Sequence, residues 1–157
     1  MSANLLRVAG LSDLAMLTTM MTEFYAEADF ALNREPAFRA FEQIIRSPGL
    51  GRAWICECDA TPAGYIVLTL AYAMEYGGVR GFVDDFYVRP QFRRRGLGAE
   101  ALAAVKTHCL ATGVRALYAQ AGPDNDVAQR VYKRGGFTDT GHQLLVQVLA
   151  SPIHKTP

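Results

Sequence analysis

Three consecutive strand signals in the middle of the chain most constrain its fold. Arg52–Cys58, Tyr65–Tyr72 and Gly81–Val88 are rich in β-branched and aromatic residues. Turn-forming residues in Asp59–Gly64 separate the first two segments, and Gly77-Gly78 precedes the third. Strands joined by connections this short pair antiparallel. The sequence therefore predicts an antiparallel three-stranded meander.

Helical patterns precede the meander. A short strand is predicted at Leu5–Val8, and Ser12-Asp13 can cap the helix that follows it. The apolar residues of that helix recur at helical spacing: Leu14, Leu17, Met21 and Phe24. A second helix begins near Glu35-Pro36, and its apolar stripe consists of Phe38, Phe41 and Ile45. Both helices therefore have a face that belongs in the core.

Helices and strands alternate after Pro90, which ends the meander. The predicted order is helix, strand, helix, strand: Gly96–Thr112, Ala116–Ala121, Asp126–Arg134 and Leu144–Leu149. The first of these helices joins parallel strands by a right-handed crossover. At 157 residues, this order indicates a mixed α/β fold in a single domain over 1–150, with 151–157 as a frayed tail.

The composition limits the classes of partner. Sixteen Lys and Arg against fifteen Asp and Glu leave a net charge of +1, which argues against nucleic acid or an anionic membrane as a partner. No secretory signal and no spanning helix are predicted. The three cysteines have no second pair or nearby histidine to complete a metal site. We therefore predict a cytoplasmic protein with reduced thiols and no metal.

A basic, glycine-rich turn follows the meander. Gly96 and Gly98 let the backbone approach a ligand, and the first turn of the following helix offers unpaired N–H groups and the positive end of its dipole. Arg93, Arg94 and Arg95 add positive charge for a diphosphate. The turn is therefore a candidate anion site.

The spacing of the two glycines is compatible with other kinds of turn. A P-loop is excluded because no Lys-Ser/Thr follows the second glycine. The spacing Gly96-x-Gly98-x-x-Ala101 matches a dinucleotide fingerprint, but residues 90–95 separate it from the strand, and no acidic residue ends the next strand. A solvated arginine run before an ordinary helix is the remaining alternative for the turn taken alone.

Two motifs together resemble those of the GNAT acetyltransferases. Arg93-x-x-Gly96-x-Gly98, after a strand ending Phe86-Tyr87-Val88-x-Pro90, resembles their motif A. Asn125-x-x-Ala128-x-x-x-Tyr132-x-x-x-Gly136-Phe137 resembles their motif B. The resemblance covers Gly81 to Phe137. It implies a GNAT fold, with a central mixed sheet of about six to seven strands, an antiparallel N-terminal meander and about four helices.

The resemblance also implies how acetyl-CoA is bound. The strand Phe86-Tyr87-Val88 binds the pantetheine arm through its backbone, and Arg93-Arg94-Arg95-Gly96-Leu97-Gly98 holds the pyrophosphate. Asn125 contacts the cofactor from the start of the motif B helix, and Ala128 leaves room beside the pantetheine.

Two side chains are expected to handle protons. Tyr132 matches the tyrosine that donates a proton to the departing CoA thiolate in many of these enzymes. Asp84 corresponds to an acidic residue of polyamine and diamine acetyltransferases, and its short side chain favours a water-mediated role as base. Strand alternation predicts that Asp84 and Asp85 face opposite sides of the sheet. A purely structural role for Asp84 stays open.

The acceptor is expected to be a small cationic amine. The candidate substrate-binding residues are Tyr72, Glu75 and Glu27. The first two lie at the end of a meander strand or in its turn, and Glu27 lies between the first two helices. We therefore predict acetyl transfer from acetyl-CoA to a primary amine by direct attack in a ternary complex. The alternatives are a non-catalytic acyl-CoA-binding regulatory module and acetylation of a protein amine. The resemblance also favours a homodimer.

Overall fold

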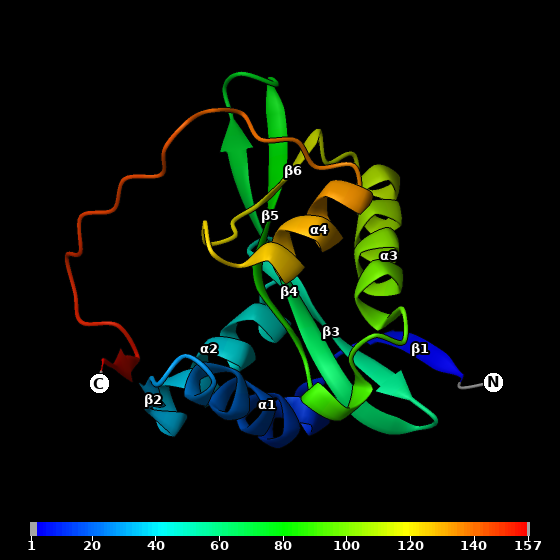
Figure 1. Ribbon diagram of the computed structural model, residues 1–157. Coiled ribbons are helices and arrows are strands. Elements are labelled where there is room, and N and C mark those ends of the chain that lie inside the picture. Colours follow the sequence, from blue (N-terminus) through cyan, green and yellow to red (C-terminus); the bar gives the residue numbers. More distant parts are fainter. Residues whose placement is uncertain (1–2, 157) are drawn as a thin grey trace.

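A five-stranded mixed sheet forms the centre of the computed structural model, which describes residues 3–156 (Figure 1). The strands lie in the order β1-β3-β4-β5-β6, and all neighbours are antiparallel except β5 and β6. Their bounds are β1 (Asn4–Val8), β3 (Gly51–Cys58), β4 (Thr61–Ala73), β5 (Gly78–Val88) and β6 (Ala116–Ala119). The predicted meander, β3-β4-β5, and the mixed α/β class are confirmed.

The sheet separates two core layers, and four helices cover them. The helices are α1 (Leu14–Ala26), α2 (Arg34–Arg46), α3 (Leu97–Ala111) and α4 (Asp126–Arg134), and single 3-10 turns at Leu11–Asp13 and Pro90–Phe92 precede α1 and α3. One core cluster joins α1 and α2 to strand residues such as Ile55 and Tyr65. The other joins α3 to the alternate residues, such as Cys56 and Ile66. Successive side chains of a strand point to opposite faces of the sheet, so each face packs against one pair of helices.

The connection between β3 and β4 is tighter than predicted. Asp59 and Ala60 both have positive φ, 50° and 62°, as the two central residues of a type I′ hairpin turn require. Thr61 and Pro62 already belong to β4, where they pair with Cys58 and Glu57. The predicted loop over Asp59–Gly64 is therefore a two-residue turn followed by strand.

The C-terminal region differs from both predictions for it. Leu144–Leu149, predicted as a strand, is an extended chain with no strand assignment, because a strand forms only against a partner and this segment has none within residues 3–156. The tail, predicted to be frayed, contains β7 (His154–Lys155), which pairs with β2 (Ala31–Leu32). Figure 1 shows the connecting chain swinging away from the sheet after α4 and returning at β2.

Two further properties bear on the sequence predictions. None of the helices in the described residues is long and apolar enough to cross a membrane. Cys56, Cys58 and Cys109 are all buried and unpaired, and burial raises the pKa of the Cys56 thiol to about 12. All three cysteines are therefore core residues, and the Cys56 thiol stays protonated at neutral pH.

Candidate functional site

The sheet opens between β5 and β6. The two strands pair only from Arg80 to Val83 on β5, opposite Ala116 to Ala119, although β5 continues to Val88. Its last five residues therefore have no strand partner on the β6 side among the described residues. Backbone groups that lack a partner in a sheet are available to a ligand. This open edge contains Phe86, Tyr87 and Val88, the residues predicted to bind pantetheine.

The head of α3 lies next to this open edge. Gly96 is the N-cap residue, with a left-handed φ of 82°, which a glycine adopts without strain. Leu97 is buried and fixes the first turn in the core. A Cβ on Gly98 would lie 3.5 Å from Cζ of Phe86 on β5 and 3.8 Å from Cγ1 of Val131 on α4. The free N–H groups of α3 therefore begin where β5 and α4 meet.

The three arginines of the turn differ in their contacts. Arg93 donates from Nε to the carbonyl of Val88, at 2.8 Å, and from Nη2 to both oxygens of Glu27, at 2.8 and 2.7 Å. Arg94 and Arg95 are exposed and form no ion pair with any described residue. Positive charge at the head of α3 therefore comes from Arg94 and Arg95, while Arg93 ties the turn to α1.

Glu27 is not placed as predicted. The sequence assigned it to the acceptor pocket, but its carboxylate accepts from Arg93 and, at 3.1 Å, from the hydroxyl of Tyr87. Burial and the hydrogen bond to Glu27 raise the pKa of Tyr87 to about 12. Glu27 is therefore the partner of Arg93, in contact with the turn that the sequence predicts to hold a pyrophosphate.

The start of α4 is organised by Asn125. Its side-chain oxygen accepts from the backbone N–H of Ala128 at 3.0 Å, which makes it the N-cap of the helix. One turn further, Tyr132 packs between Phe86 and Phe137, with ring centroids 6.5 and 5.3 Å away. Burial and the charge of Asp85 raise the pKa of Tyr132 to about 12. Tyr132 is therefore protonated at neutral pH and lies beside the open edge of β5.

A β-bulge changes the predicted orientation of the two aspartates. Val83 pairs with Leu68 and Asp85 with Val67, so Asp84 has no residue opposite it. Such an extra residue interrupts strand alternation. Val83 before the bulge packs in the α3 cluster, whereas Tyr87 after it packs in the cluster of α1 and α2. Asp84 and Asp85 therefore lie on the same side of the sheet, and the prediction of opposite faces is wrong.

Asp85 is the more enclosed of the two carboxylates. Its Oδ2 accepts from the hydroxyl of Tyr65 at 2.9 Å, and Tyr65 itself is fully buried. Burial raises the pKa of Asp85 to about 6, although the Tyr65 hydrogen bond opposes this shift. Asp84 is exposed, yet nearby protein atoms still desolvate its carboxylate and raise its pKa. Tyr65 was not identified from the sequence, because only the register of β4 against β5 brings it to Asp85.

The remaining predicted substrate residues lie elsewhere. Tyr72 pairs with Val79 near the tip of the β4–β5 hairpin, and Glu75 is in the turn itself. Asp85 is six residues further along β5 than Val79, roughly 20 Å at ~3.3 Å per residue. The structure therefore does not bring Tyr72 or Glu75 to the carboxylates.

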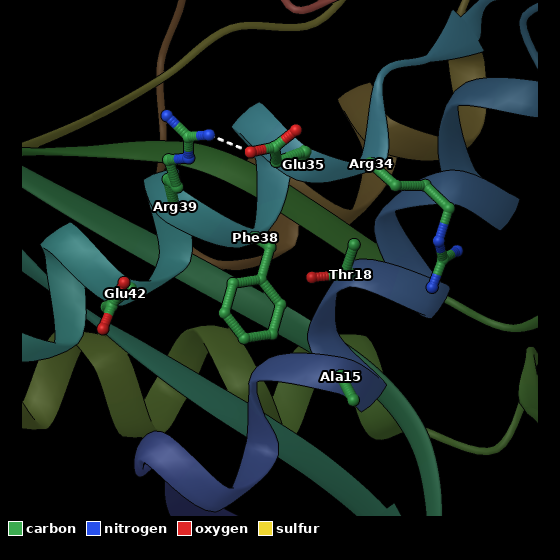
Figure 2. Close-up of a pocket in the computed structure, with 7 residues that line it drawn as sticks. All are labelled: Ala15, Thr18, Arg34, Glu35, Phe38, Arg39 and Glu42. Atoms are coloured by element: carbon green, nitrogen blue, oxygen red, sulfur yellow. Dashed lines mark hydrogen bonds and ion pairs between the residues drawn. The ribbon is translucent and has the colours of Figure 1, made fainter.

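A cavity of about 570 Å³ between α1 and α2 contains none of these residues (Figure 2). In Figure 2 the Phe38 ring lies between the two helices, and Glu35 is paired with Arg39 on α2. The lining consists of Ala15, Thr18, Arg34, Glu35, Phe38, Arg39 and Glu42. Because its charged groups are paired with one another, with Arg46 or with α1, the open edge of β5 is the stronger candidate site.

The chain is similar to known proteins in sequence and in fold. The chain is 32% identical to aminoglycoside N(6')-acetyltransferase type 1 of Salmonella typhimurium over 102 residues, which are 63% of this chain and 70% of the relative. An integron cassette protein from the mobile metagenome of Cole Harbour Salt Marsh has 49% identity and a TM-score of 0.88, covering 94% and 92% of the two chains.

A more distant structure shares the fold. The aminoglycoside N-acetyltransferase AAC(6')-Iy in complex with CoA has 18% identity and a TM-score of 0.81, over 96% of this chain and 97% of that one. The model of the acetyltransferase (GNAT) family matches residues 16–137. The chain therefore belongs to the GNAT family of acetyltransferases.

Proposed function

We propose that this chain transfers an acetyl group from acetyl-CoA to a primary amine of a small cationic molecule. The observation that carries the proposal is the open edge of β5 between the head of α3 and Tyr132. One strand edge, one anion site and one proton donor meet there, as thioester binding and cleavage require.

Acetyl-CoA fits the groups that line this edge. The backbone of Phe86 and Val88 has no strand partner on the β6 side and binds the pantetheine arm in the manner of an added strand, although the Val88 carbonyl also accepts from Arg93. The N–H groups after Gly96 hold the pyrophosphate, with Arg94 and Arg95 adding charge. Asn125, which caps α4 through Ala128, contacts the cofactor from the head of that helix, and Ala128 leaves room beside the pantetheine.

Proton transfer is divided between two side chains. Asp85 accepts a proton from the substrate ammonium through a water molecule, because its pKa of about 6 leaves it ionised and basic at neutral pH. The neutral amine attacks the thioester carbonyl and forms the C–N bond, and the C–S bond breaks. Tyr132 donates its hydroxyl proton to the departing thiolate, and the proton that the amide nitrogen loses returns to Tyr132. Asp84, exposed beside Asp85, binds the ammonium group before this transfer.

The class of acceptor follows from charge. Asp84 and Asp85 place two carboxylates on one side of the sheet, which favours a cationic amine. The relative that is 32% identical acts, by its name, on aminoglycosides, which carry several amino groups. A polyamine or an aminoglycoside is therefore a better candidate than a protein amine.

The test combines binding and turnover. Thiol release from acetyl-CoA is followed with spermidine, an aminoglycoside and a basic peptide, and CoA affinity is measured by calorimetry. We expect Tyr132→Phe to lower kcat by about 10²–10⁴-fold, the usual contribution of a positioned acid, with CoA affinity unchanged. CoA binding without thiol release for any amine supports the regulatory module instead. Unchanged kcat in Tyr132→Phe rejects the assignment of the acid.

A further inference from the structure

Arg93 and Glu27 form an ion pair between the turn at the head of α3 and the end of α1. Arg93 donates from Nη2 to both oxygens of Glu27, at 2.8 and 2.7 Å, and from Nε to the carbonyl of Val88, at 2.8 Å. The side chains of Arg93 and Glu27 are 42% and 40% exposed. An ion pair this open to water is weak, so a stronger ligand can take either partner.

A diphosphate bound at the turn competes with Glu27 for Arg93. Arg93 lies three residues before Gly96, and its guanidinium already reaches the open edge of β5 through the Val88 carbonyl. A diphosphate carries more negative charge than one carboxylate, and a guanidinium binds phosphate through two parallel hydrogen bonds. Acetyl-CoA, bound as in the proposed function, therefore draws Arg93 away from Glu27.

Glu27 keeps one partner when Arg93 leaves. The Tyr87 hydroxyl donates to Glu27 Oε1 at 3.1 Å, and the Tyr87 ring is buried, so the carboxylate stays attached to the sheet. Arg93 is the one cation paired with Glu27 among residues 3–156. A carboxylate beside protein that has lost its cation attracts another one. Glu27 is therefore prepared to bind a positive group of a second ligand.

The freed carboxylate lies on the side of the sheet where the proposed base acts. Tyr87 follows Asp85 by two residues on β5, roughly 7 Å at ~3.3 Å per residue. Both contact Tyr65, since Asp85 accepts from its hydroxyl at 2.9 Å and the two tyrosine rings are 6.3 Å apart. One flexible molecule with two amino groups can therefore reach both Asp85 and Glu27.

We propose that acetyl-CoA binding releases Glu27 from Arg93 and makes it the site for a second ammonium group of the acceptor. This inference rests on the proposed function. Asp85 takes the proton from the amine that is acetylated, while Glu27 pairs with another amine of the same molecule. The acceptor class is thereby narrowed to molecules with at least two amino groups. The two substrates bind cooperatively, and each raises the affinity of the other by the same factor.

The test measures amine binding by calorimetry with and without saturating CoA, which has no acetyl group to transfer. Spermidine and kanamycin are the probes, and thiol release from acetyl-CoA identifies the one that is acetylated. CoA should raise the affinity of that amine by about fivefold, the upper end for an exposed ion pair. In Glu27→Gln the affinity should be the same with and without CoA. In Arg93→Gln the amine should bind without CoA as tightly as it binds the natural sequence with CoA.

Glu23→Gln is the matched control. Glu23 lies one turn before Glu27 on α1, its side chain is 38% exposed, and it pairs with Arg89 at 2.8 Å. The substitution removes the same charge from the same helix but leaves the Arg93–Glu27 pair intact. The effect of CoA on amine affinity should therefore persist in Glu23→Gln.

The other outcomes overturn the inference. An effect of CoA that persists in Glu27→Gln comes from the charge of CoA itself, and an effect that is also lost in Glu23→Gln comes from the general charge of α1. CoA binding and thiol release with no change in amine affinity reject the coupling and leave the proposed function intact. Absence of both CoA binding and thiol release rejects the proposed function, and this inference with it. Arg93→Gln tests the coupling from the other partner, so the result does not depend on Glu27→Gln folding.

Discussion

Tyr65→Phe removes the one hydrogen bond that the described structure gives to the Asp85 carboxylate from a side chain. The pKa of Asp85, about 6, is raised by burial and by the charge of Asp84, and lowered by Tyr65. A hydrogen bond to a charged group contributes about 1.5–3 kcal/mol, and one pKa unit is about 1.4 kcal/mol. The acid limb of the pH profile should therefore move upward by about one to two pH units.

The assay is kcat/KM for spermidine acetylation between about pH 5 and 9, which reports the ionisation of the free enzyme. Activity in Tyr65→Phe should fall at neutral pH and recover at higher pH, because Asp85 is intact and only its pKa has changed. The acceptor amine titrates equally in every variant, so the difference between profiles belongs to the protein.

Tyr25→Phe is the matched control for this experiment. Burial and the charges of both carboxylates raise the pKa of Tyr25 to about 12, but its hydroxyl donates no hydrogen bond to either one in the described structure. The acid limb of the pH profile of Tyr25→Phe should therefore stay at the pH of the natural sequence. An unmoved limb in Tyr65→Phe, or an equal shift in Tyr25→Phe, refutes the assignment of Asp85 as the base.

Three further predictions follow from particular contacts. Folding raises the pKa of Asp85 from 3.8 to about 6. The contribution of Asp85 to stability is therefore complete below pH ~4 and is lost as pH rises through ~6. Urea unfolding at pH ~7 should show that Asp85→Asn is more stable than the natural sequence, by up to about 3 kcal/mol. Gly96 has a φ of 82°, and a Cβ added there would have no atom closer than 3.9 Å. Gly96→Ala should therefore lose about 1–2 kcal/mol of stability from backbone strain alone, whereas Gly98→Ala should lose none. Equal losses would contradict this reasoning. Glu27→Gln should increase CoA affinity several-fold in calorimetry by freeing Arg93, and a decrease would mean that Glu27 positions Arg93 for the ligand.

Local patterns predicted the starts of α3 and α4 well. The glycine at the head of α3 is identifiable because only a glycine enters a helix from a left-handed conformation without strain, and Gly96 does so. Asn125 is identifiable as a cap because its side chain satisfies an N–H three residues away. Both signals depend on residues close together in the sequence.

Long-range register was not predictable in the same way. The bulge at Asp84 depends on how β4 aligns with β5, and the pairing of Asp85 with Tyr65 follows from it. The ion pair of Glu27 with Arg93 joins residues 66 positions apart. Leu144–Leu149 has the composition of a strand, but composition does not name a partner, and pairing decides whether a strand forms.

The gap between β5 and β6 exists because β6 stops early. Ala119 lies opposite Val83, and the chain then leaves the sheet while β5 continues for five residues. A chain whose β6 continued past Ala119 would gain ladder hydrogen bonds, and it would close the gap with its own backbone. Under the proposed function, a longer β6 would add stability and remove the acetyl-CoA site, so stability and function oppose each other at this short strand.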